Sequence, residues 1–160
     1  MTFDNKKTSY RIYLRKFYLA ISVTLIIILL LFSGFFEDPL LGLTKTHYII
    51  IIAGIYLLII LINFIRKQNY FYFNDSGKNI IVRYYPLRPM ARSRKSIEIP
   101  KARFAGFEIR DSLLGLKKTL VLKQVLKKSV AQYPPISISS LTRKELNILV
   151  RQLSLYKPAT

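Results

Sequence analysis

The residues best suited to binding chemistry are cations that gather in a short stretch near the middle of the chain. Four positive side chains fall within eight residues: Arg88, Arg92, Arg94 and Lys95. Such a cluster can bind headgroup phosphate, another anion or a protein partner beside a membrane, and Lys117 and Lys118 are candidates for the same role. The alternative for the loop is a solvated segment held near lipid by general charge. The alternative for the two lysines is protection of an edge strand against aggregation.

Residues for catalysis or metal binding are scarce. The chain has no cysteine, which excludes disulfides and cysteine nucleophiles, and its one histidine gives little support for a metal site. We find no phosphate-binding glycine loop and no nucleophile motif. The acids of the C-terminal strand region form no evident acid–base pair: Asp75, Glu98, Glu108 and Asp111. The sequence therefore predicts a protein that is not an enzyme and has no cofactor, metal or small-molecule substrate.

Aromatic side chains interleave with cations in the same region. A sheet face of this composition can stack nucleic-acid bases. The alternative is a strand that is half core and half membrane-interface belt. The residues concerned are Tyr70, Phe71, Tyr72, Phe73, Tyr84 and Tyr85, beside Arg83 and Arg88.

Two long apolar segments must position these side chains. Phe17–Phe36 has 20 residues and Tyr48–Ile65 has 18, and neither contains a charged side chain. A hydrocarbon core about 30 Å thick is crossed by roughly 20 apolar helical residues. Neither segment shows the polar face of a helix that lies on a soluble core. We therefore predict a transmembrane helical hairpin, because a chain this short has no second layer to hide two such helices.

Charges at the ends of the two segments predict the orientation. Arg15 and Lys16 precede the first segment, and Arg66 and Lys67 follow the second. Cationic flanks stay on the cytoplasmic side, so these four residues are expected at the inner interface and both termini in the cytoplasm. The link Glu37–His47 is then expected outside. The location expected is the bacterial inner membrane, with the chain as a multi-pass protein.

Composition divides the chain into three parts. Residues 1–16 are expected to be a basic cytoplasmic arm, residues 17–67 the hairpin, and residues 68–160 a cytoplasmic domain. From Arg66 onward there are 20 lysines and arginines against five acidic residues, a net charge of +15. A domain this basic beside a membrane suits anionic lipid, an acidic protein partner or ribosomal RNA.

The cytoplasmic domain is expected to alternate strands and turns and to end in one helix. Gly106 predicts a bulge or a bend, and Pro134-Pro135 predicts an edge strand or a bulge. Thr142 and Glu145 match a capping box, and the following apolar residues share one helix face: Leu146, Leu149, Val150 and Leu153. The expected strands, six or seven in all, cover 70–74, 79–85, 96–99, 102–109, 117–125 and 130–138.

Three stretches carry a resemblance to a known family: Ser96–Pro100 (SIEIP), Leu114–Lys123 (LGLKKTLVLK) and Tyr133–Ser139 (YPPISIS). With the preceding two-helix hairpin, they resemble bacterial pleckstrin-homology-like (PH-like) domains. The resemblance covers about residues 70–156. It implies an α+β fold, a small antiparallel β-barrel or sandwich of six to seven strands capped by a C-terminal helix. Its motifs concern packing and turns, so it implies no catalytic residue.

The function expected is that of a non-catalytic accessory or scaffold subunit in an inner-membrane complex. The hairpin would pack against an integral-membrane partner, and the PH-like domain would dock on a cytoplasmic partner. One alternative is a sensor of anionic lipid that uses the basic loop. A second alternative is an accessory of a membrane insertion or secretion machine that contacts ribosomal RNA.

Overall fold

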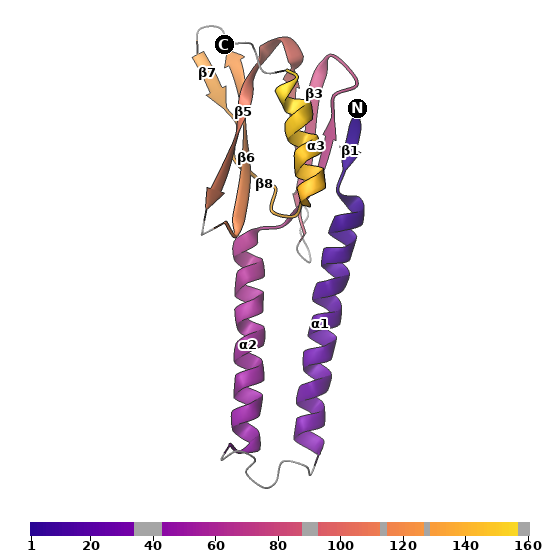
Figure 1. Ribbon diagram of the computed structural model, residues 1–160, viewed down its shortest axis with the longest axis vertical. Helices are drawn as coiled ribbons and strands as arrows, with labels where there is room; N and C mark the ends of the chain where they lie inside the picture. The colour runs from indigo at the N-terminus through magenta and orange to yellow at the C-terminus, as the bar shows by residue number, and fades with distance from the viewer. Residues whose placement is uncertain (34–42, 88–92, 113–114, 127–128, 157–160) are drawn as a thin grey trace. The chain divides into compact units, whose positions relative to one another are not determined.

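The computed structural model describes residues 1–33, 43–87, 93–112, 115–126 and 129–156. Its elements are β1 (Thr2–Asp4), α1 (Lys6–Phe32), α2 (Lys45–Arg66), β2 (Asn69–Asn74), β3 (Asn79–Pro86), β4 (Lys95–Pro100), η2 (Lys101–Arg103), β5 (Phe104–Ser112), β6 (Lys117–Leu126), β7 (Ser129–Gln132), β8 (Ile136–Ser137) and α3 (Arg143–Ser154) (Figure 1). The chain forms two compact units. We call Met1–Tyr10 with Ile65–Thr160 the β domain, and Arg11–Phe64 the helical pair.

The helical pair consists of two helices that are each long and apolar enough to cross a membrane. Residues 17–32 and 48–65 of the two expected spans are helical, whereas residues 34–42 lie outside the described part of the chain. None of the α2 residues is buried within the chain. Apolar surface of this extent is stable where lipid or other membrane helices cover it.

Polar groups within the helical pair are satisfied locally. The Lys45 ammonium group donates hydrogen bonds to the carbonyl of Leu31 at 2.7 Å and to that of Ser33 at 3.3 Å. The last carbonyls of a helix have no partner within the helix, and a cation there also offsets the helix dipole. Thr24 and Asn63 donate to the carbonyl four residues earlier, each at 2.9 Å. Lys45 therefore serves as a cap for α1.

Two antiparallel sheets form the β domain. The first has the order β1-β2-β3-β4, and the second has the order β5-β6-β7, with β8 paired to β6. The α+β arrangement and the C-terminal helix are as expected, and the seven described strands after residue 67 are within the expected six to seven. The strand that was not expected is β1, which precedes the helical pair. The expected strand 130–138 is divided at Pro134-Pro135, because proline has no N–H for a strand ladder. The bulge at Gly106 is confirmed by a register shift and a φ of +123°.

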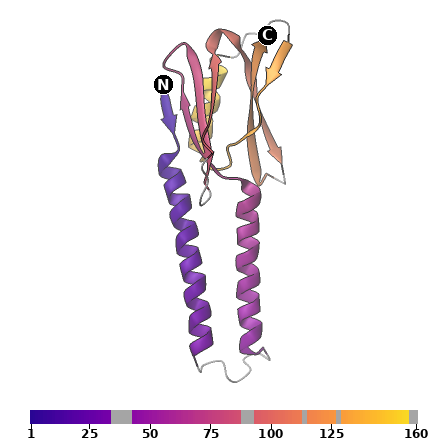
Figure 2. The same cartoon turned by 180° about the vertical axis from the view of Figure 1, so that it is seen from behind.

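Alternation along the strands builds one core. In β2, Phe71 and Phe73 are buried while Tyr70 and Tyr72 are not. Figure 2 shows α3 behind strands of the first sheet, and its Leu149 and Leu153 are 0% exposed and belong to the same core. The predicted capping box of α3 is present, with Thr142 as the cap and Glu145 as its partner.

The first sheet includes one strand, β1, that precedes the helical pair in sequence, whereas its other three strands follow the helical pair. β1 pairs with β2, so that Thr2 lies opposite Asn74 and Asp4 lies opposite Tyr72. Residues 1–16 are therefore not a separate arm: residues 2–4 are a strand, and α1 already begins at Lys6. Paired strands cannot lie on two sides of a bilayer. β1 and the rest of the β domain thus share one side of any membrane that the helical pair crosses.

Candidate anion-binding site

The predicted cationic site is only partly brought together. Arg88 and Arg92 lie outside the described residues. Lys95 begins β4 and Lys117 begins β6, and these two residues line adjoining cavities. Arg94 is exposed and lines neither of them. Lys118 instead extends its ammonium group to within 3.7 Å of the Asp111 carboxylate.

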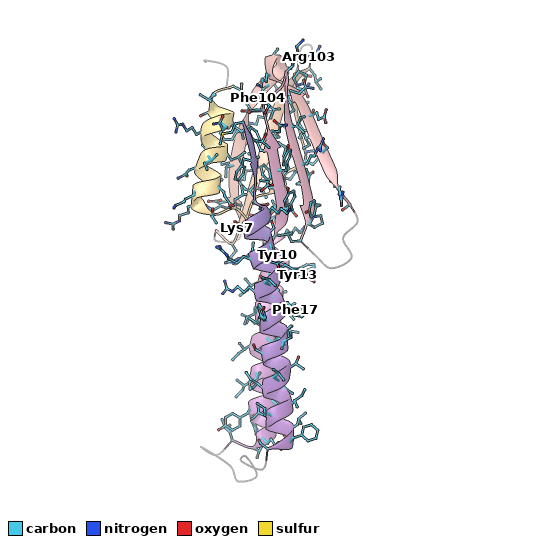
Figure 3. The ribbon with its side chains drawn as sticks, turned by 90° about the vertical axis from the view of Figure 1, so that its right-hand side faces the viewer. Lys7, Tyr10, Tyr13, Phe17, Arg103 and Phe104 are labelled. Atoms are coloured by element: carbon cyan, nitrogen blue, oxygen red, sulfur yellow. The ribbon has the colours of Figure 1, made fainter. Side chains whose placement is uncertain are left out.

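The four residues expected at the inner membrane interface lie within α1, for Arg15 and Lys16, and at the end of α2, for Arg66 and Lys67. Arg15 is exposed and Lys16 is half-buried on α1. Figure 3 shows three aromatic residues along the same helix, at a spacing that places them on one face: Tyr10, Tyr13 and Phe17. Arg66 ends α2 and Lys67 follows it, and both are exposed. Their role at an interface stays a prediction.

Lys67 has an unusual backbone conformation. Its φ of +43° is the only positive value among the described residues other than glycine. This left-handed conformation costs a lysine about 1 kcal/mol, and glycine or asparagine adopts it more easily. It turns the chain from the end of α2 into β2, as left-handed residues often do after a helix.

A cavity of about 350 Å³ in the β domain is lined by Lys67, which follows α2, and by Lys117, which begins β6. Its polar wall is formed by Asn69, Thr119 and Ser137, and prolines complete it. A second cavity, of about 170 Å³, is lined by Lys95 and shares the wall residue Asn69 with the first. The structure therefore groups Lys67, which was predicted for the membrane interface, with two of the predicted anion-binding residues, Lys117 and Lys95.

Hydrogen bonds hold the polar wall of the larger cavity in place. The Ser137 hydroxyl donates to the Arg66 carbonyl at 3.1 Å, and the Thr119 hydroxyl donates to the Arg110 carbonyl at 3.2 Å. The Asn69 side-chain amide donates to the Ser137 carbonyl at 3.2 Å. With these bonds formed, Lys67 and Lys117 are the charged residues among those that line this cavity.

Most other cations of the second sheet are neutralised by acids. Arg110 donates to Glu108 at 2.6 Å, and Lys123 lies 3.1 Å from the same carboxylate. These bonds, that from Arg110 foremost, lower the pKa of Glu108 to about 2. By contrast, neither Lys67 nor Lys117 forms an ion pair with an acid in the described part of the chain.

The chain matches no protein-family model, no curated protein and no solved structure. The resemblance to PH-like domains therefore rests on the residues quoted for it and stays a prediction. The candidate anion-binding site is therefore inferred from the geometry of the structure alone.

The aromatic residues of the first sheet are largely engaged with one another or with the core. The rings of Tyr70 and Tyr85 stack at 4.6 Å between centroids. The guanidinium of Arg83 lies 6.0 Å from the Tyr72 ring centroid, on the outer face. Phe71 is completely buried. This arrangement favours the half-core interpretation, and stacking with RNA bases stays a prediction.

Asn5 is a buried polar residue that the sequence interpretation missed. Its side-chain oxygen accepts from the Phe71 backbone N–H at 2.8 Å, and its amide donates to the Ser140 hydroxyl at 3.0 Å and the Asn69 carbonyl at 3.3 Å. Asn5 thus joins the start of α1, the start of β2 and the segment before α3. The available signal was its type, since asparagine before a helix is a favoured N-cap.

Asp75 is a buried carboxylate in the turn after β2. Burial alone would raise its pKa, but the Met1 amino group and the Tyr156 hydroxyl, which donates at 3.1 Å, both hydrogen-bond to the charged form. The net result is a pKa below the ordinary value. Lys101 donates to the Asp75 carbonyl at 2.6 Å and adds positive charge nearby.

This shift predicts that Asp75 contributes to acid stability. A carboxylate whose pKa is lower in the folded state contributes stability above its unfolded pKa of about 3.9, and that contribution is lost as pH falls through the folded value. We expect Asp75→Asn to lower stability at neutral pH and to flatten its decline below about pH 4. Thermal unfolding at a series of pH values measures this. A decline in Asp75→Asn as steep as in the wild type would contradict it.

Proposed function

We propose that the protein is a non-catalytic accessory subunit, anchored in the bacterial inner membrane by its helical pair, whose β domain docks on a protein partner in the cytoplasm. The pairing of β1 with β2 carries the proposal. This pairing joins both ends of the helical pair to one folded domain. Both ends must then lie on the same side of the membrane, which fits two crossings of the membrane and not one. The cationic flanks of α1 and α2 favour the cytoplasmic side for that domain.

The two antiparallel sheets and the following helix support the further proposal that the β domain is PH-like. Antiparallel strands β2 to β8 followed by α3 agree with the six to seven strands and C-terminal helix that the resemblance implies, and β1 lies outside the stretch it covers. Such a domain is a scaffold on which binding surfaces can differ, so function depends on the surface rather than on the fold.

The end of the β6–β7 hairpin supports docking. Val125 and Val130 lie opposite each other in the register and are 41% and 56% exposed, and Leu126 beside them is 45% exposed. We call these three residues the apolar tip. β7 also has no described strand on its outer side. Since the C-terminal part of the chain carries a net charge of +15, the partner proposed is an acidic protein surface with a small apolar centre.

Affinity purification of the full chain from bacterial membranes in mild detergent tests this function. We expect a partner in stoichiometric amount, lost when Val130→Lys places a charge in the apolar tip. Ile148→Lys is the matched control, because Ile148 is 37% exposed on α3 and lies outside the tip. Recovery of the chain alone, or equal loss of the partner in both variants, would argue against docking at this place.

A further inference from the structure

We infer that the cavity between Lys67 and Lys117 is a binding site for a phosphate group, carried by an anionic lipid headgroup or by a free phosphate compound. It is separate from the apolar tip and needs no protein partner. Its cations come from two parts of the chain that only the fold brings together, the end of α2 and the start of β6.

The charges of the cavity point to an anion. Both lysines line it, and no acid is among the described residues that do so. Two cations that line one cavity repel each other, and an anion bound there offsets that repulsion. Two neighbouring lysines differ in this respect. The Lys118 ammonium group lies 3.7 Å from the Asp111 carboxylate, and that of Lys123 lies 3.1 Å from the Glu108 carboxylate. Two cations without an acid partner among the described residues therefore line this one cavity.

The backbone of Lys67 is an independent observation. A φ of +43° favours glycine or asparagine after the end of a helix, yet a lysine is present. Strained residues of this kind are often found at binding sites, where the side chain is needed in spite of the backbone cost. A simpler explanation for a lysine at this position is that its charge offsets the negative end of the α2 dipole. A substitution that keeps the backbone but removes the charge separates these explanations.

The shape of the site suits a phosphate rather than a large apolar ligand. Its volume of about 350 Å³ is at the lower end of small-molecule sites, and its wall of hydroxyl and amide groups is fixed by hydrogen bonds. Lysine binds phosphate as a point charge, without the planar geometry that arginine imposes. The position of Lys67 favours a lipid source, because this residue directly follows α2, a helix long and apolar enough to cross a membrane.

The test measures the thermal midpoint of the full chain in non-ionic detergent, with inorganic phosphate or with chloride at equal ionic strength. A ligand that binds the folded state raises the midpoint as its concentration rises. We expect phosphate to do so in the wild type, and Lys117→Gln to weaken phosphate binding by about tenfold. Lys67→Asn should weaken it as much, while its midpoint without phosphate is equal to or above that of the wild type. Lys118→Gln is the matched control and should respond as the wild type does.

A second experiment, which measures bound lipid, distinguishes a lipid headgroup from a free phosphate compound. Native mass spectrometry of the same variants, after extraction from vesicles of phosphatidylcholine and phosphatidylglycerol, counts the anionic lipid retained. Loss of phosphatidylglycerol in Lys67→Asn and Lys117→Gln identifies a headgroup, whereas a phosphate response without that loss identifies a free phosphate compound.

Three results would overturn the site: no midpoint response to phosphate in the wild type, an undiminished response in Lys67→Asn, or an equal loss in Lys118→Gln. None of these depends on the apolar tip, so failure of partner docking and failure of the phosphate site are separate outcomes.

Discussion

Replacing Asn5 with alanine is expected to lower the free energy of unfolding of the β domain by about 3 kcal/mol, since each buried polar group left without a partner costs roughly 1–3 kcal/mol. Asn5 is 0% exposed, and its loss removes the acceptor of the Phe71 N–H and the donor to Ser140. It also removes the acceptor of the Ser9 hydroxyl at 3.0 Å. The effect should be large because all of these groups are shielded from water.

Denaturant unfolding of the full chain in detergent, followed by the circular dichroism of the sheets, measures this loss. Asn147→Ala is the matched control, because Asn147 is an exposed asparagine on α3. We expect the control to change stability by less than about 0.5 kcal/mol, as is usual for surface positions. Equal stability of the two variants would mean that β1 and the start of α1 are not fixed to β2 as described.

Replacing Leu149 with alanine is expected to cost about 2–5 kcal/mol, the range for deletion of a large buried side chain. Leu149 is 0% exposed and shares the core with Phe71 of the first sheet and Leu120 of the second. Its truncation leaves a cavity where α3 meets the sheets. We expect lower cooperativity of unfolding as well, because the packing that α3 shares with both sheets is weakened.

The neighbouring residue provides the control for this second variant. Ile148 precedes Leu149 on α3 but is 37% exposed, so Ile148→Ala should cost much less in the same denaturant experiment. Similar losses for Ile148→Ala and Leu149→Ala would show that α3 does not bury the face assigned to it.

Local patterns in the sequence accounted for most of the elements. The apolar lengths predicted the two helices, the alternation around Phe71 and Phe73 predicted β2, and Gly106 predicted the bulge. The Thr142–Glu145 spacing predicted the start of α3 because both capping bonds join residues three apart. Each of these features is decided within a few neighbouring residues, which is why a single sequence reveals them.

Features that depend on distant residues were not foreseen. β1 has three residues, too few for a periodic pattern, and its partner strand follows only after both membrane-candidate helices. Asn5 is buried by groups from β2 and from the segment before α3, and nothing in its own neighbourhood indicates this. The approach of Lys67 to Lys117 is likewise a consequence of tertiary structure. The basic loop was preferred instead because its charges are adjacent in sequence.

The central claim is that the helical pair crosses the membrane as a hairpin and leaves β1 and the β domain together in the cytoplasm. The chain has no cysteine, so single-cysteine variants can be labelled without background. Thr44→Cys reports the link between the helices, while Thr2→Cys and Ser76→Cys report β1 and the turn after β2. A membrane-impermeant maleimide added to intact spheroplasts should label Thr44→Cys alone, and the other two only after lysis. Labelling of Ser76→Cys in intact spheroplasts, or protection of Thr44→Cys, would contradict the account.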